Sequence, residues 1–146
     1  MSEPVAPRDD VYFLDTNILM YAVGSEHPLR QPCRDALRKS VDARVPLITD
    51  AEVLQEILHH YFAIQRPDAA GAVYRSAVDL CEEVLPVTEK ETSRALDLLR
   101  SHAEITPRDA IHVATMEAAG IRNLLSADRD FDVIPSVRRV DPSQFL

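Results

Sequence analysis

Residues 11–17, VYFLDTN, decide the fold, because a short run of β-branched and aromatic residues ends there at a carboxylate. Such a run predicts a buried strand over residues 11–14, and a helical segment is expected to follow from about Asn17. Asp15 therefore sits at a junction of strand and helix. In open sheets of parallel strands, chemistry gathers beyond the carboxyl ends of the strands, which is where Asp15 is expected to lie.

The alternation of strand and helix continues along the chain. Short apolar runs predict further strands at residues 45–48, 84–87, 121–126 and 137–140. Apolar residues at helical spacing predict helices at residues 28–43, 51–65, from Pro67 onward, 89–101 and 107–120. Parallel strands require such crossovers. The pattern predicts an α/β fold with a mostly parallel central sheet of four to five strands and helices on both faces.

Length and composition indicate one domain with a core of its own. The chain has 146 residues, of which 46% are hydrophobic. That is enough to bury a core without a metal or a disulfide. Residues 1–10, MSEPVAPRDD, are expected to form a frayed leader, and residues 11–146 a single domain.

Charge and residue usage exclude several classes of function. The net charge of −8 disfavours binding to nucleic acid by simple attraction, so such binding would need a metal or a local basic patch. Three scattered glycines exclude phosphate-cradling and dinucleotide-binding loops. Cys33 and Cys81 lack zinc-site spacing and suit a reduced compartment. With no signal peptide and no apolar run of about 18 residues, the sequence predicts a cytoplasmic protein without membrane contact.

Four carboxylates stand where they could converge on one rim. Asp15 follows the first strand, and Asp128 follows the fourth. Asp109 lies in the first turn of a helix, and Glu56 lies on the polar side of the helix over residues 51–65. Like charges brought together either take up protons or bind a cation. Oxygen ligands favour Mg²⁺ or Mn²⁺, either of which would supply the positive charge that meets a phosphodiester.

Four segments also carry a family resemblance. They are FLDTNILMYA at residues 13–22, ITDAEVLQEIL at 48–58, TPRDAIHVATMEAAGI at 106–121 and LLSADRDFD at 124–132. In this order and spacing they resemble the four motifs of PIN domains, and most closely those of VapC-type ribonuclease toxins from toxin–antitoxin pairs. The similarity extends from about Val11 to Asp132, which is nearly the whole chain.

The resemblance implies a PIN-like fold and a metal-dependent endoribonuclease that hydrolyses RNA phosphodiester bonds. The four catalytic acids it implies are Asp15, Glu56, Asp109 and Asp128. Of these, Asp15, Asp109 and Asp128 would hold Mg²⁺, with Mn²⁺ as the alternative, while Glu56 would share the metal or orient the attacking water. Asn17 would order the first motif, and Ser126 would occupy a position where the family carries Thr or Ser.

The second motif departs from the family pattern. Asp50 replaces the usual Ser or Thr, which leaves Glu52 as a rival to Glu56. In the fourth motif Asp128 is preferred to Asp130 and Asp132. A cognate antitoxin and a homodimer are the partners that the resemblance implies.

Other interpretations remain open at this point. The same scaffold could be a non-cleaving module that binds RNA or protein. A phosphatase with Asp15 as nucleophile fits poorly, because position 17 is Asn and no Lys follows Lys90. Each acid also has a structural interpretation as a helix cap or a surface residue. His59 and His112 are expected to be helix-surface or partner-contact residues.

Overall fold

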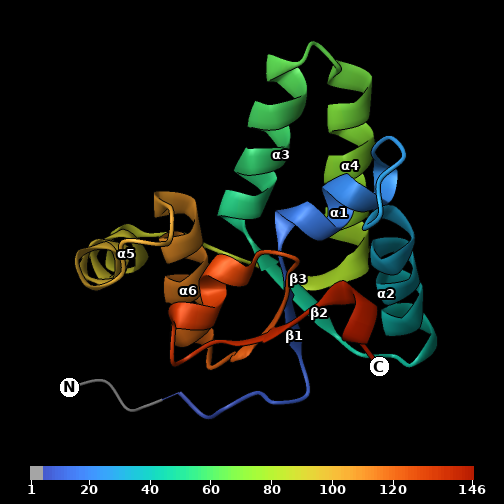
Figure 1. Cartoon of the computed structure of the whole chain (residues 1–146). Coiled ribbons are helices and arrows are strands. Elements are labelled where there is room, and N and C mark those ends of the chain that lie inside the picture. Colours follow the sequence, from blue (N-terminus) through green and yellow to red (C-terminus); the bar gives the residue numbers. More distant parts are fainter. Residues whose placement is uncertain (1–4) are drawn as a thin grey trace.

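The computed structural model describes residues 5–146 (Figure 1). Over these residues, pairs of α-helices separate successive strands up to β4, giving five strands and six α-helices, with two short 3₁₀ helices near the end. They are β1 (Tyr12–Leu14), α1 (Thr16–Val23), α2 (Arg30–Asp42), β2 (Leu47–Asp50), α3 (Ala51–Ala63), α4 (Pro67–Leu80), β3 (Cys81–Leu85), α5 (Glu89–Ser101), α6 (Pro107–Ala119), β4 (Asn123–Leu125), η1 (Arg129–Val133), β5 (Arg138–Val140) and η2 (Pro142–Gln144).

The strands form one parallel sheet in the order β3-β2-β1-β4-β5. β1 is central, with Phe13 opposite Ile48 of β2 on one side and Leu124 of β4 on the other. Helices α5 and α6 lie on one face, and α1, α2 and α4 lie on the other (Figure 1). The predicted α/β fold with a parallel sheet covered on both faces is therefore confirmed, and the sheet has five strands.

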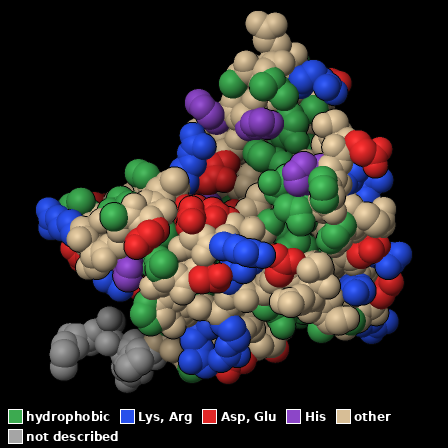
Figure 2. All heavy atoms as spheres, in the orientation of Figure 1, with side chains coloured by type: hydrophobic (Ala, Val, Ile, Leu, Met, Phe, Trp, Pro, Cys, Tyr) green, Lys and Arg blue, Asp and Glu red, His purple; other side chains and the backbone are tan. Residues whose placement is uncertain are grey.

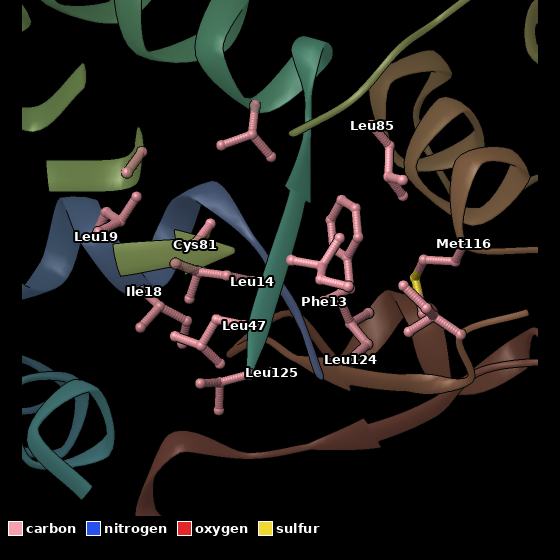
Figure 3. Packing of buried hydrophobic residues seen from close by; sticks show 14 of the residues in the cluster. Phe13, Leu14, Ile18, Leu19, Leu47, Cys81, Leu85, Met116, Leu124 and Leu125 are labelled. Carbon is pink, nitrogen blue, oxygen red and sulfur yellow. The ribbon is translucent and has the colours of Figure 1, made fainter. Parts of the chain in front are cut away.

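The core lies where the central strands meet these helices. Phe13, Leu14, Leu124 and Leu125 are completely buried, and Figure 3 shows them packed between the two helical layers. Because both faces of β1 are covered, its residues form a continuous apolar run rather than an alternating one. This explains why the first strand is readable from sequence.

The third strand starts earlier than expected. The apolar run at residues 84–87 predicted it, but β3 begins at Cys81, directly after α4. Glu82 and Glu83 are exposed in this strand, which lies at the edge of the sheet. Charged side chains are common on edge strands, where they oppose pairing with another sheet, and here they hide the start of the strand from a search for apolar residues.

The described part of the leader contacts the body of the domain. Residues 1–4 of the expected leader lie outside the described residues. The Arg8 N–H donates to the Gly120 carbonyl at 2.8 Å, and the Arg122 guanidinium pairs with Asp9 at 3.2 Å. In residues 5–146, every helix is too short or too polar to cross a bilayer.

Candidate active site

The carboxyl ends of β1 and β4 bring the first and fourth motifs together. Asp15 follows β1 and caps α1, accepting the Thr16 N–H at 2.7 Å. Ser126 follows β4, the parallel neighbour of β1, and its hydroxyl donates to Asp15 Oδ2 at 2.6 Å. The Asn17 amide donates to Asp15 Oδ2 and to Ser126 Oγ, both at 3.2 Å. The Asp15 carboxylate is therefore held from three sides.

The loop after β4 presents Asp128. Ser126 Oγ accepts the Asp128 N–H at 3.1 Å, and the Asp128 carboxylate accepts the Asp130 N–H at 2.9 Å, which caps η1. From β5, the Arg139 guanidinium donates to the Ser126 carbonyl at 3.0 Å and pairs with Asp132 at 2.8 Å. These contacts fix the loop at both ends.

Asp109 is placed by the start of α6. Thr106 and Asp109 form a reciprocal capping box, in which each side chain accepts the backbone N–H of the other at 3.2 Å. Pro107 occupies the first turn, where its missing N–H costs no hydrogen bond. The sequence TPRD therefore fixes both the helix start and the position of the Asp109 carboxylate.

Glu56 enters from α3, and its side chain is only 13% exposed. Thr16 Oγ donates to Glu56 Oε2 at 2.5 Å, while Glu56 Oε1 lies 2.9 Å from His112 Nε2. All four predicted acids line one cavity of about 420 Å³, whereas Glu52 does not line it. Figure 2 shows acidic side chains gathered in this hollow between α3 and α6. The structure thus brings Asp15, Glu56, Asp109 and Asp128 together.

The expectation that His112 lies on the surface is wrong. Its ring is completely buried, with Nδ1 2.8 Å from Asp50 Oδ2 and Nε2 2.9 Å from Glu56 Oε1. It follows Asp109 by one turn of α6, so the same helix end that carries Asp109 to the cavity places His112 behind Glu56. His59, by contrast, is exposed on α3 and lines the cavity.

Asp50 does more than cap a helix. It caps α3, with Oδ1 accepting the Val53 N–H at 2.9 Å. Its other oxygen accepts the Thr115 hydroxyl and faces His112, both at 2.8 Å. Sequence reasoning missed this network. The available signals were the His one turn after Asp109 and an Asp in place of a small hydroxyl residue in the second motif.

The burial and convergence of these acids shift the pKa values of several groups at the site. Burial raises the pKa of Asp15 to about 6, against the opposing effects of His112 and Ser126, and Glu56 and Asp109 raise it further. Burial likewise raises the pKa of Asp109, and Asp128 adds to the shift although the hydrogen bonds with Thr106 oppose it. For His112, burial would lower the pKa, but contact with Asp50 and Glu56 holds it well above the ordinary value.

Comparison with known proteins identifies the family. The PIN domain profile matches residues 12–137. The chain belongs to the PIN domain family. Ribonuclease VapC13 of Mycobacterium tuberculosis is 38% identical over 127 residues, which cover 87% of this chain and 97% of that protein. Ribonuclease VapC7 of the same organism is 36% identical over 130 residues, covering 88% and 90%.

Solved structures of toxins share the PIN fold. The sarcin-ricin loop cleaving toxin VapC20 of M. tuberculosis superposes with a TM-score of 0.69 at 22% identity, over 85% of this chain and 95% of that one. VapBC2 from Rickettsia felis, bound to a DNA fragment from its promoter, gives a TM-score of 0.70 at 18% identity, over 90% and 98%. At these identities the likeness concerns the fold.

The residues of this PIN domain suit a hard divalent cation. The acids that line the cavity offer carboxylate oxygens, the donors that Mg²⁺ and Mn²⁺ prefer. Their mutual repulsion, which contributes to the raised pKa of Asp15, would be relieved by a cation. Atoms of Asp15, Glu56 and His112 lie within 4.8 Å of one another, but both ring nitrogens of His112 face carboxylates. His112 is therefore a partner of the acids rather than a ligand.

Proposed function

We propose that this PIN domain is a metal-dependent endoribonuclease and the toxin of a toxin–antitoxin pair. The observation that carries the proposal is the set of four carboxylates from separate parts of the chain that line one cavity. The relatives of the chain that are named VapC ribonucleases support RNA as the substrate. In a PIN fold, the carboxyl edge of the sheet is the place where such chemistry is expected.

Asp15, Asp109 and Asp128 would hold Mg²⁺ or Mn²⁺. The ion would lower the pKa of a bound water and neutralise charge on the phosphate oxygens. Ser126 and Asn17 keep the Asp15 carboxylate directed at the cavity. Glu56, oriented by two contacts of its own, accepts a proton from the attacking water or fixes its direction.

Arg108 would bind the RNA backbone at the cavity wall. It lines the cavity beside Asp109, is exposed, and forms no ion pair with any of residues 5–146. A guanidinium free of carboxylate partners can donate two hydrogen bonds to one phosphate. His59 and His60 of α3 line the same cavity and would add donors along the RNA.

The test is RNA cleavage by the purified protein on total and transfer RNA, with Mg²⁺, with Mn²⁺ and with EDTA. Asp15→Asn should abolish metal-dependent, site-limited cuts, and Glu56→Gln should reduce them strongly to a measurable residual rate, while both variants stay folded. Two matched controls, Asp130→Asn in η1 and Glu52→Gln in α3, should retain cleavage. RNA binding by the folded wild-type protein without cleavage in any metal would instead support a non-cleaving binding module.

We propose a cognate antitoxin as the second partner. We also propose that the toxin is a cytoplasmic homodimer. Solved neighbours with this fold include DNA-bound VapBC from Salmonella typhimurium and a VapBC complex of M. tuberculosis. An equimolar amount of the cognate antitoxin should suppress cleavage, and light scattering should give twice the 16.4 kDa mass of one chain for the free toxin. Undiminished cleavage in excess antitoxin would contradict the assignment as a restrained toxin.

A further inference from the structure

A continuous chain of polar groups lies behind the cavity. The Thr115 hydroxyl donates to Asp50 Oδ2 at 2.8 Å, and the same oxygen faces His112 Nδ1 at 2.8 Å. The opposite side of the ring, His112 Nε2, faces Glu56 Oε1 at 2.9 Å, and Thr16 donates to the second oxygen of Glu56. The chain connects α6, the end of β2, α3 and the start of α1.

Both contacts of the His112 ring are made to acceptors. Since a carboxylate only accepts, both ring nitrogens donate, and the ring links two acids as an imidazolium. Phe13 packs against the ring, with centroids 5.4 Å apart. The imidazole is completely buried, so water cannot replace either of its hydrogen bonds.

The two ends of the link differ in how much they depend on the ring. Asp50 keeps donors without it, because the Val53 N–H reaches Oδ1 and the Thr115 hydroxyl reaches Oδ2. Glu56 keeps only the Thr16 hydroxyl, and it stands at the cavity wall with part of its surface exposed. Without His112, the Glu56 side chain would be held by the Thr16 hydroxyl alone at one of its two oxygens.

We propose that His112 is a positioning residue, which holds the Glu56 carboxylate in the orientation needed to direct the attacking water. This inference rests on the proposed function of the cavity. In this role His112 touches neither RNA nor metal and acts on the attacking water through Glu56. Groups that orient a residue of a metal site from behind contribute about 10-fold to 100-fold to activity or metal affinity.

Two substitutions separate the two ends of the ring. The amide nitrogen of Asn replaces Nδ1, and that of Gln replaces Nε2. His112→Asn therefore keeps a donor for Asp50 and loses the donor for Glu56, whereas His112→Gln keeps the donor for Glu56. We expect kcat to fall about 10-fold to 100-fold in His112→Asn with KM little changed, and to recover largely in His112→Gln. Equal activity of the two variants would overturn the inference.

A double-mutant cycle tests whether His112 acts through Glu56. In a Glu56→Gln background, His112→Asn should cause no further loss of the residual kcat, because the carboxylate that the ring orients is gone. Independent, multiplicative losses would overturn the proposal. As a control for the loss of a buried polar contact, Glu91→Ala removes an acceptor of the α5 capping box and should lower stability without changing kcat.

Two measurements test the inference without a cleavage assay. A crystal structure of His112→Asn should show Glu56 turned away from its wild-type position, and an unchanged Glu56 would overturn the proposal. In wild-type protein, the Nε2–H proton of His112 should appear in the NMR spectrum as a slowly exchanging downfield signal that disappears in Glu56→Ala, which removes the acceptor. Persistence of that signal would overturn the link. If the wild type fails to cleave RNA, the nuclease proposal fails, while these two readouts still decide whether His112 orients Glu56.

Discussion

Asp15→Asn should stabilise the metal-free protein at neutral pH and destabilise it in acid. Asp15 is 5% exposed, and its pKa is raised from 3.8 to about 6, chiefly by burial. Its folded-state pKa lies above the unfolded value, so the folded protein binds more protons between these two values. Stability is therefore lost as pH rises through this window, and above pH 6 the loss amounts to about 3 kcal/mol.

The Asn side chain removes this loss but has a cost of its own. Its carbonyl oxygen can still accept the Thr16 N–H, whereas its amide then faces the Asn17 amide, which is also a donor. One unsatisfied buried donor costs about 1–2 kcal/mol. The net expectation at pH 7.5 is a gain of about 1–2 kcal/mol. At pH 4, where wild-type Asp15 is largely protonated in the folded state, Asn should be the less stable side chain by about 1 kcal/mol.

Urea unfolding in EDTA at pH 4, 5, 6 and 7.5 measures the difference between wild type and variant. All other titrating groups are common to both proteins, so the difference reports on Asp15 and its couplings. Added Mn²⁺ should raise the stability of the wild type and leave Asp15→Asn nearly unchanged. Asp130→Asn, which changes an exposed carboxylate nearby, should give a difference that stays flat with pH. A stability difference for Asp15→Asn without a change of sign between pH 4 and 7.5 would refute the reasoning.

Three further perturbations test other parts of the structure. Arg108→Gln should weaken RNA binding in EDTA and reduce the slope of log K for RNA binding against log salt concentration by about 0.7–0.9. Arg75→Gln on α4, away from the cavity, should change neither. An unchanged slope for Arg108→Gln would show that Arg108 does not contact RNA. Burial raises the pKa of Cys33 to about 11 and of Cys81 to about 12, so a thiol reagent at pH 8 should label neither before urea unfolds the chain, and rapid labelling would contradict their burial. Gly120→Ala should lower the free energy of unfolding by about 1–3 kcal/mol, measured by urea unfolding. The φ angle of Gly120 is +72°, and the added Cβ would lie 2.4 Å from the Ala6 carbonyl oxygen of the leader. Unchanged stability would show that the leader moves aside.

The parts of the fold that could be predicted are those decided by short-range patterns. The apolar run ending at Asp15 marks β1, and TPRD marks the start of α6 with its capping box. Glycine at position 120 ends that helix in the left-handed conformation. Each of these signals depends on a few neighbouring residues, so they can be recognised without knowledge of the packing.

The network behind the cavity could not be predicted in this way. His112 lies between apolar residues of α6, where it could face solvent, a partner or the core. Its burial depends on Asp50 and Glu56, which lie far away in sequence and meet it only when α3 and α6 pack beside β2. The early start of β3 was missed for a related reason, since the exposure of Glu82 and Glu83 follows from the position of that strand at the sheet edge.

The charge balance of the cavity explains why a chain with a net charge of −8 can act on a polyanion. The buried imidazolium of His112 is balanced by Asp50, so the four ionised carboxylates that line the cavity leave four negative charges, and one divalent cation would reduce them to two. A phosphodiester entering such a site would still meet a negative surface. The guanidinium of Arg108 on the cavity wall, which pairs with no carboxylate of residues 5–146, offsets part of this remaining charge. The cation makes the chemistry possible, and Arg108 makes the approach of RNA possible. Removal of the cation should therefore abolish cleavage, whereas removal of the Arg108 guanidinium should weaken RNA binding.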